Sequence, residues 1–337
     1  MASADTRPLP ELCIVVPAFN EQENLPVLYR ELAQALDARG VSFQLLVVDD
    51  GSRDRTPEIL RQLARQDARV IGLRLSRNFG HQEAISIGLQ HAKGRSVAIM
   101  DADLQDRPSD LLALYECWRG GADVAYAVRR TRREWLGRRL AYLAFYRALA
   151  RLADVQIPLD SGDFCVMDGA FVERLNALPE RLRFVRGLRA WLGGRQEAVA
   201  VDRDARRFGE PQYTFSKLLR LALDGLFSFS DAPLRLASLV GASISMLAFA
   251  GAVVILVWKF MGELPSGAAT ATIALGVFFL GGLQLLTIGI LGEYISRIFR
   301  EVKSRPVAVV AEMISGAATP SSLPQHVDSE HLRPVRQ

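Results

Sequence analysis

Short apolar runs and amphipathic stretches alternate along the first hundred residues. The apolar runs hold valine, isoleucine and leucine without polar alternation, which is typical of strands buried on both faces of a parallel sheet. The stretches between them place apolar residues at helical spacing. We therefore predict an α/β domain with a mostly parallel, Rossmann-like sheet. The expected strands are LCIVVP from residue 12, FQLLVVDD from 43, RVIGLRL from 69 and SVAIMD from 96, and the expected helices cover 21–40, 56–65 and 82–91.

Polar clusters follow three of these strands: PAFNE at 17–21, DDGSRD at 49–54 and DADLQD at 101–106. In open α/β sheets, ligands bind at the carboxyl ends of the strands. Three acidic loops at one sheet edge are hard to explain as devices for stability. We expect a nucleotide with its metal ion to bind there.

Asp101 and Asp103 stand where the fourth apolar run ends. On an extended chain, positions i and i+2 project to the same side, so both carboxylates are expected to meet one cation. Hard cations such as Mg²⁺ or Mn²⁺ prefer oxygen ligands. The alternative is that Asp103 caps a helix beginning near Pro108. No GxxxxGK[ST] or GxGxxG loop is present, so an ATPase or a dinucleotide dehydrogenase is not favoured, and a bound diphosphate would need a metal and arginines.

Charge and cysteine content exclude some classes of protein. The 41 basic and 37 acidic residues give a formal charge of +4, which is too small to indicate a nucleic-acid partner. Cys13, Cys117 and Cys165 match no zinc spacing and are expected to be reduced. Residues 1–11 have no apolar core, so we expect a flexible N-terminus without a signal peptide.

Two stretches near the C-terminus, 236–258 and 264–292, contain no charged residue. At about 1.5 Å per residue, either can cross a hydrocarbon layer of about 30 Å. We predict a two-helix transmembrane hairpin over 236–296, with spans at about 236–258 and 271–292. Two buried core helices are the alternative. Basic residues flank the outer ends, and the link MGELPSGAAT at 261–270 carries Glu263 and no lysine or arginine. The positive-inside rule therefore puts the N-terminal domain and both termini in the cytoplasm, although Lys259 at the far edge argues weakly the other way.

The segments beside these spans carry further expectations. Residues 214–235 are amphipathic and rich in leucine and phenylalanine, so we expect them to lie in the membrane interface. The run RRTRREWLGRR at 129–139 either forms a solvated basic helix face or binds anionic headgroups or the acceptor's phosphate. Residues 297–337 are expected to form a cytosolic basic segment and a disordered tail.

A set of motifs carries a family resemblance. VPAFNE, VVDDGS, MDADLQD, SGDF, RFVRGLRAWLG and RRFGEPQY occur in order before the two spans, and ILGEYISRIF continues the match through the second span. The sequence resembles the family 2 glycosyltransferases that act on polyprenyl phosphates, of the dolichyl-phosphate mannosyltransferase and bacterial polyprenyl-phosphate glucosyltransferase type. The resemblance covers about residues 12–306. It implies a GT-A fold in residues 12–213 and a nucleotide-sugar donor.

The resemblance also implies roles for individual residues. Asp103 and Asp163 are the implied catalytic carboxylates, with Asp163 facing the sugar; the alternative for Asp163 is a capping residue in a Ser-Gly-Asp turn. The implied metal, Mg²⁺ or Mn²⁺, is met by Asp101, Asp103 and Gln105. The implied donor-binding residues are Pro17, Phe19, Glu21, Val48, Asp50, Asp101, Ala102, Arg129, Arg206 and Gln212.

Two positions depart from the pattern of the family. Gln212 stands where a lysine is common, which removes one positive charge from the expected phosphate contacts. Cys165 follows SGDF where an arginine is usual.

We therefore predict a membrane-bound, metal-dependent, inverting hexosyltransferase of the bacterial inner membrane. It would move a sugar from a nucleotide-sugar, with uridine the commonest base among bacterial relatives, to an undecaprenyl-like phosphate. Its expected partners are the donor, the polyprenyl phosphate, the bilayer and a second copy through the membrane helices. A processive polysaccharide synthase and an inactive membrane scaffold are the alternatives, although the QxxRW motif of the former is absent.

Overall fold

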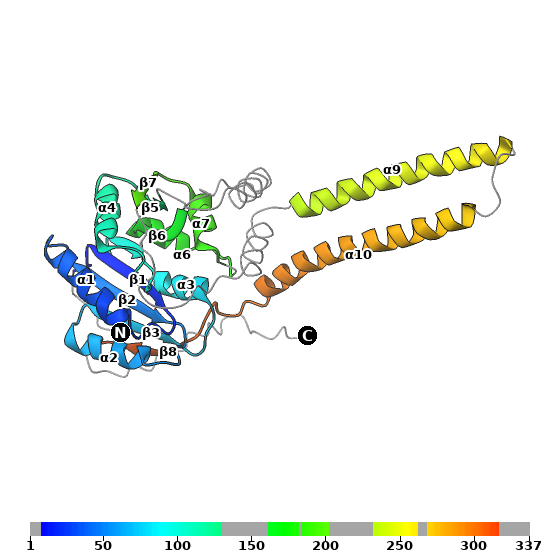
Figure 1. Cartoon of the computed structure of the whole chain (residues 1–337). Coiled ribbons are helices and arrows are strands. Elements are labelled where there is room, and N and C mark those ends of the chain that lie inside the picture. The colour runs from blue at the N-terminus through cyan, green and yellow to red at the C-terminus, as the bar shows by residue number, and fades with distance from the viewer. Residues whose placement is uncertain (1–7, 130–160, 182, 202–231, 262–267, 317–337) are drawn as a thin grey trace, which may run out of the picture. The chain divides into compact units, whose positions relative to one another are not determined.

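The computed structural model describes residues 8–129, 161–181, 183–201, 232–261 and 268–316 (Figure 1). Arg206, Gln212, nearly all of the basic run at 129–139 and most of the expected interfacial segment at 214–235 lie outside these ranges. Internal contacts divide the chain into two units, 1–104 with 308–337, and 105–307. The predicted boundaries run in a single order along the chain, whereas the first unit combines N-terminal and C-terminal residues.

The first unit contains five sheet strands in the order β4-β1-β2-β3-β8. Its first four strands are parallel, which confirms the prediction of a mostly parallel α/β fold. They alternate with helices close to the expected positions. The strands are β1 (Leu12–Ala18), β2 (Phe43–Asp49), β3 (Val70–Leu75) and β4 (Ser96–Ile99), and the helices are α1 (Leu25–Asp37), α2 (Thr56–Gln66) and α3 (His81–His91).

Helices cover both faces of this sheet, as Figure 1 shows. A Cβ on Gly88 of α3 would clash with Val15 and approach Val48, so α3 lies close against one face. A Cβ on Gly72 of β3 would instead meet Leu60 of α2. Gly72 pairs with Val47, the neighbour of Val48, and adjacent strand residues point to opposite faces, so α2 covers the other face. Burial on both faces explains the unalternated apolar runs.

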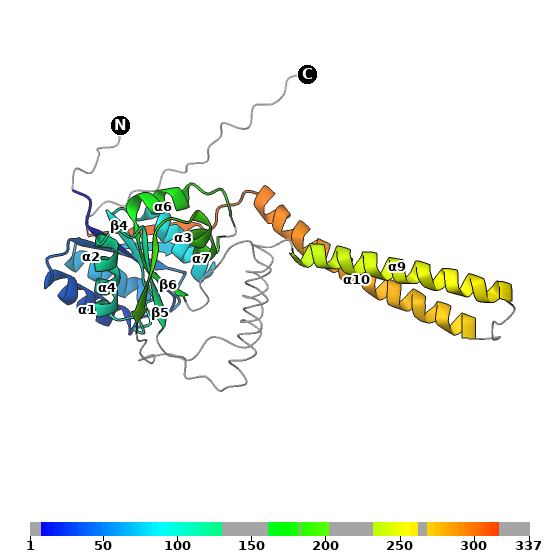
Figure 2. The same ribbon diagram turned by 90° about the horizontal axis from the view of Figure 1, so that it is seen from above.

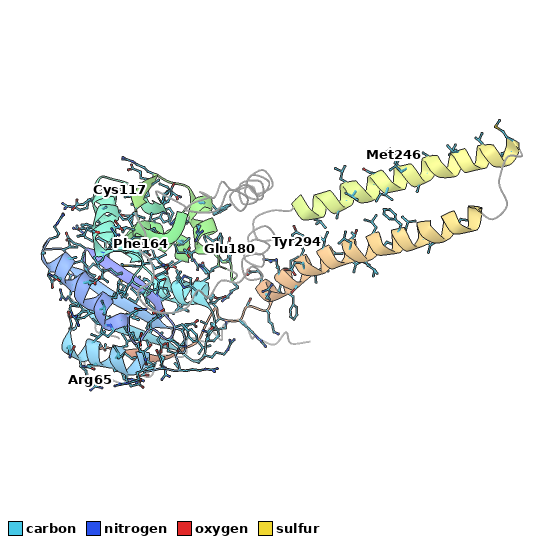
Figure 3. The ribbon with its side chains drawn as sticks, viewed as in Figure 1. Arg65, Cys117, Phe164, Glu180, Met246 and Tyr294 are labelled. Atoms are coloured by element: carbon cyan, nitrogen blue, oxygen red, sulfur yellow. The ribbon has the colours of Figure 1, made fainter. Side chains whose placement is uncertain are left out.

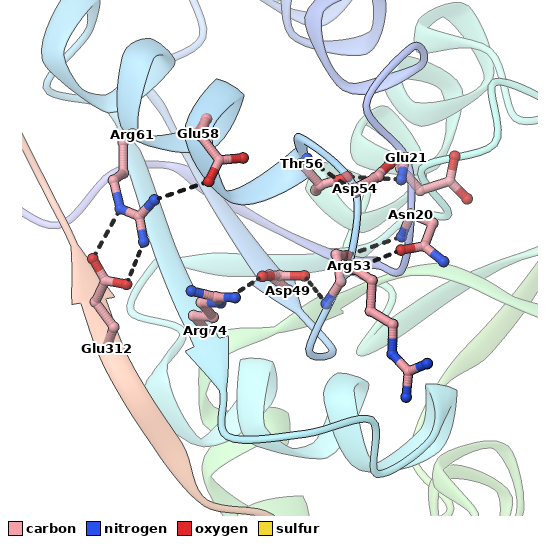
Figure 4. Close-up of polar contacts among 11 residues, drawn as sticks. Asn20, Glu21, Asp49, Arg53, Asp54, Thr56, Glu58, Arg61, Arg74 and Glu312 are labelled. Carbon is pink, nitrogen blue, oxygen red and sulfur yellow. Dashed lines mark hydrogen bonds and ion pairs between the residues drawn. The ribbon is translucent and has the colours of Figure 1, made fainter.

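A C-terminal strand, β8 (Val310–Ile314), joins this sheet antiparallel to β3. Arg61 of α2 forms a bidentate ion pair with Glu312, with nitrogen–oxygen distances of 3.0 and 2.7 Å (Figure 4). Sequence patterning did not indicate this strand, because its five residues alternate weakly and their partner is over 200 residues away. Part of the region expected to be a basic segment and tail is therefore ordered sheet.

The second unit contains three sheet strands in the order β7-β5-β6. In this sheet β5 (Val124–Arg129) is antiparallel to β6 (Ser161–Asp168) and parallel to β7 (Gln196–Val201). Helix α4 (Pro108–Arg119) contacts all three strands. The other short helices are α6 (Gly169–Asn176) and α7 (Val185–Leu192).

Two long helices complete the second unit: α9 (Ala232–Met261) and α10 (Ala268–Val302). They contact each other and run side by side in both views (Figures 1 and 2). Their large apolar side chains are exposed, for example Met246 (Figure 3) at 73% and Phe260 at 85%, unlike those of buried core helices. Among the described residues, 279–302 is the one stretch long and apolar enough to cross a membrane; it overlaps the span predicted at 271–292, and the span predicted at 236–258 stays a prediction.

Candidate active site

The loops after β1 and β2 are tied together by hydrogen bonds between backbone and side chain (Figure 4). The Asn20 N–H donates to the hydroxyl of Ser52, and the Asn20 side-chain oxygen accepts from the Arg53 N–H, both at 2.9 Å. The Glu21 N–H donates to the hydroxyl of Thr56 at 2.9 Å. These bonds fix the backbone around Phe19 and Glu21 at the carboxyl edge of the sheet.

The paired aspartates Asp49 and Asp50, at the end of β2, make separate contacts. Asp49 is fully buried, accepts a hydrogen bond from the Ser52 N–H at 2.9 Å and lies 3.4 Å from the Arg74 guanidinium. Asp50 accepts from the Phe79 and Gly80 N–H groups at 2.7 and 3.0 Å. Burial raises the pKa of Asp50, although these two N–H donors act in the opposite direction. Asp50 therefore joins the end of β2 to the loop that precedes α3.

That loop and the start of α3 bring in residues that the sequence had not assigned to the site. The His81 Nε2 lies 3.6 Å from an Asp101 carboxylate oxygen. Glu83, two residues further on, has a raised pKa because it is largely buried. The sequence alone leaves His81 in NFGHQ as a possible ligand or, more often for a lone histidine, a structural hydrogen-bonder, because its proximity to Asp101 depends on where α3 begins relative to β4.

Asp101 and Asp103 lie at the end of β4, as predicted, but the geometry assumed for them is wrong. The strand ends at Ile99, residues 102–103 form a turn, and Leu104 has a left-handed φ of 58°. The two carboxylates thus lie on a turn and not on an extended strand. The alternative role of Asp103 is also wrong, because the N-cap of α4 is Arg107 and no side chain caps that helix.

The donor chemistry of this turn fits a divalent cation. Asp101 and Asp103 supply carboxylate oxygens at the sheet edge, with Asp101 about one-third exposed and Asp103 buried. In the described parts of the chain, no group of three or more His, Cys, Asp or Glu residues forms a metal site. Two carboxylates, completed by phosphate oxygens and water, make the usual protein share of a Mg²⁺–phosphate site. Gln105 begins the second unit.

The first unit brings together most of the expected donor residues. Strands β4, β1 and β2 are neighbours, so their carboxyl ends share one edge. The predicted residues at this edge are Pro17, Phe19, Glu21, Val48, Asp50, Asp101, Ala102 and Asp103. Their individual roles stay predictions.

In the second unit, Asp163 of β6 faces an arginine of α7. The Arg186 Nη2 lies 3.4 Å from the Asp163 Oδ1, and the Asp163 side chain is 12% exposed. Arg189, one turn further along α7, is 2% exposed, and its guanidinium lies 5.1 Å from the ring centroid of Tyr126. It also neighbours Cys165, whose pKa is raised by complete burial. Arg129 is the last residue of β5.

The sequence profile of glycosyl transferase family 2 matches residues 13–175. An uncharacterized glycosyltransferase of Synechocystis is 39% identical over 306 residues, covering 90% of this chain and 95% of its own. The chain belongs to glycosyl transferase family 2. A bactoprenol glucosyl transferase derived from an SfII prophage in Shigella flexneri is 36% identical, covering 91% of this chain and 99% of its own. Among solved structures, mannosyl-3-phosphoglycerate synthase from Rubrobacter xylanophilus is 19% identical, with a TM-score of 0.45 over 69% of this chain and 75% of its own.

Family membership confirms the resemblance inferred from the motifs. It also confirms that the protein is an enzyme, a hexosyltransferase with a GT-A-like α/β fold. Ligands of open α/β sheets bind at the carboxyl ends of the strands, which makes the turn of Asp101 and Asp103 the centre of the candidate active site.

Proposed function

We propose that this glycosyltransferase moves a hexose from a nucleotide-sugar, UDP-linked, to a polyprenyl phosphate and yields a polyprenyl-monophosphate-sugar. The observation that carries the proposal is the full-length similarity to proteins named bactoprenol glucosyl transferase, which extends beyond the catalytic fold into the apolar helices. The enzyme would act in the bacterial inner membrane, with its catalytic part and both termini in the cytoplasm.

The strand-end edge of the first unit would bind the donor. Phe19 and Glu21 stand on a backbone fixed by the Ser52 and Thr56 hydroxyls, so the base and ribose would meet a preorganised surface. Asp101 and Asp103 would hold Mg²⁺ or Mn²⁺ against the diphosphate. The metal, when bound, neutralises charge on the departing nucleoside diphosphate. Arg129 and Arg206 would add phosphate contacts.

The acceptor needs little help from a general base. A phosphomonoester has a second pKa of about 6, so it is largely a dianion near neutral pH. A phosphate oxygen attacks the anomeric carbon, the bond from that carbon to the diphosphate oxygen breaks, and the configuration inverts. The acceptor loses one negative charge and the nucleoside diphosphate gains one, so no proton moves. We assign Asp163 to orienting the sugar, because Arg186 already holds its carboxylate.

Transfer with labelled donors tests this proposal. Purified full-length protein in detergent, with Mg²⁺ or Mn²⁺, is incubated with a panel of nucleotide-sugars and undecaprenyl phosphate. We expect one labelled sugar per lipid, released by mild acid, and no product with undecaprenol, which lacks the phosphate. A water-insoluble polymer would indicate a processive synthase instead. Absence of product with every donor would indicate an inactive scaffold.

A further inference from the structure

Helix α7 carries buried positive charge that lacks a full set of partners. Arg189 Nε and Nη2 and Arg186 Nε are buried and have no hydrogen-bond partner among the described residues. An unpaired buried charge is costly, and native proteins usually satisfy such groups. A guanidinium presents its donors in a planar fork that fits phosphate oxygens. The free donors of α7 therefore match a missing anion.

The nearby carboxylate does not balance this charge. Asp163, Arg186 and Arg189 all act electrostatically on the Cys165 thiol, so the three charged groups are neighbours around one point. They comprise two guanidinium groups and one carboxylate. The Arg186–Asp163 separation of 3.4 Å is longer than the 2.7–2.9 Å typical of a strong charge-assisted hydrogen bond. The cluster is left with an excess of positive charge.

The hydrogen bonds between the segment before α7 and the end of α10 indicate the source of the anion that the α7 arginines would bind. Glu301, in the last turn of α10, accepts hydrogen bonds from the Arg181 N–H at 3.1 and 3.0 Å. Arg181 precedes α7 by only four residues, so the end of the apolar helix holds the segment that leads into the arginine helix. A lipid phosphate lies at the end of a membrane helix, at the level of the headgroups.

The outer face of α7 supports the same placement. Trp191 is 58% exposed, although most large apolar side chains of this unit outside α9 and α10 are buried. Tryptophan is enriched at membrane interfaces, where its ring sits among the headgroups. Helix α7 thus directs arginines inward and an interfacial aromatic residue outward.

We propose that Arg186 and Arg189 of α7 form the site for the phosphate group of the polyprenyl phosphate acceptor, next to Asp163. This inference rests on the proposed transfer to a polyprenyl phosphate and adds the residues that would receive it. Arg189 supplies its Nε and Nη2, the two nitrogens that have no partner among the described residues. Arg186 contacts the acceptor phosphate and Asp163 together, which places the nucleophile beside the residue that orients the sugar.

Steady-state kinetics of Arg189→Gln separate acceptor binding from donor binding. The glutamine keeps a polar chain but removes the charge. We expect the acceptor KM to rise about tenfold or more, while the donor KM stays within about twofold of the wild type. The matched control is Arg119→Gln, which removes an arginine that is 61% exposed on α4 and should change neither constant.

Three outcomes would contradict the inference. Unchanged constants would mean that Arg189 is structural, and a rise in the donor KM alone would assign it to the diphosphate. Stabilisation of the wild type by inorganic phosphate as strongly as by polyprenyl phosphate, in thermal melting, would indicate a general anion site. If Arg189→Gln does not fold, the same measurements on Arg186→Gln decide. A wild type that transfers to no polyprenyl phosphate would refute the proposed function itself, which is a different result.

Discussion

The two units differ in how far their buried polar groups are bonded: among the described residues, buried atoms without a hydrogen-bond partner are few in the first unit, the Asp49 Oδ2 being one, and they gather on and around α7 in the second. At the carboxyl edge of the first unit, Asn20 and Asp49 are bonded to backbone N–H groups or to neighbouring side chains (Figure 4). Asp50 accepts from the backbone N–H groups of Phe79 and Gly80. On α7 of the second unit, Arg186 and Arg189 keep buried N–H groups without described partners. A satisfied network makes a rigid platform before any ligand arrives. An unsatisfied cluster gains most from the ligand, so we expect substitutions in the bonded loops of the first unit to lower stability and substitutions of the α7 arginines to lower affinity.

The largest effect is expected on the transfer rate, at Asp103 in the proposed metal site. Asp103→Asn removes a ligand charge from the buried turn without changing its shape. We expect transfer to fall by about 100-fold or more with the fold intact, because a metal with one charged ligand fewer is held weakly. Rates measured against Mn²⁺ concentration, with circular dichroism for the fold, check this.

Glu23→Gln is the matched control, since Glu23 is an exposed carboxylate in the loop after β1. It should retain activity close to the wild type. Full activity of Asp103→Asn with unchanged Mn²⁺ dependence would remove the metal from this turn.

The rigid platform is tested by Asp50→Asn. The amide replaces one carboxylate oxygen by a donor, which then faces the N–H of Phe79 or Gly80. We expect a loss of about 1–3 kcal/mol in the free energy of unfolding of the first unit, reduced in part because the amide avoids the burial cost that raises the pKa of Asp50. Urea unfolding followed by fluorescence measures it.

Asp37→Asn serves as the comparison, because Asp37 forms a half-exposed pair with Arg69 and should cost far less. Equal losses in the two variants would mean that the loop before α3 is not held by Asp50.

Sequence reasoning predicted the first unit better than the second, for physical reasons. Strands β1–β4 are buried on both faces, so composition alone marks them, and the helices between them are local. The turn at Asp103 was mistaken for extended chain, because the left-handed φ of Leu104 has no signature in that residue type. Strand β8 depends on pairing with β3, far away in sequence.

The arginines of α7 show a different limit. The motif RFVRGLRAWLG supported the resemblance, but nothing in its spacing distinguishes a buried arginine from a solvated one. The burial of Arg189 comes from packing near Tyr126 and Cys165 on β5 and β6. Those strands lie up to about sixty residues before it in the chain, so the site had to be found in three dimensions.

A smaller effect is expected at the edge strand of the first unit. In the wild type, the bidentate pair with Arg61 lowers the pKa of Glu312. Glu312→Gln weakens this pair. A lowered carboxyl pKa stabilises the fold above the unfolded pKa of about 4 and ceases to do so as the pH falls through the folded value. We expect a loss of about 0.5–1 kcal/mol at pH 7 that disappears in acid.

Hydrogen exchange of the β3 and β8 amides at pH 7 measures this loss locally. Arg65→Gln, on the same helix, is the control because no ion pair is described for Arg65. Unchanged exchange in Glu312→Gln would mean that backbone pairing alone holds β8.

The smallest effect on stability is expected at Glu83, where the substitution should stabilise the fold and not destabilise it. Burial raises the pKa of this carboxyl, so the folded protein binds its proton more tightly than the unfolded chain does. The resulting cost is absent below the unfolded pKa of about 4.3 and is complete once the pH exceeds the raised folded value. Glu83→Gln removes an ionisable group from this position, so the variant should match the wild type in acid and gain about 0.5 kcal/mol at neutral pH. Thermal melting from pH 4 to 8 measures the difference, with the exposed Glu23→Gln as the flat reference. A destabilised variant at pH 7 would mean that the Glu83 carboxylate makes stabilising contacts in the first unit. The difference between the two units in bonded buried polar groups would then be larger than these contacts indicate.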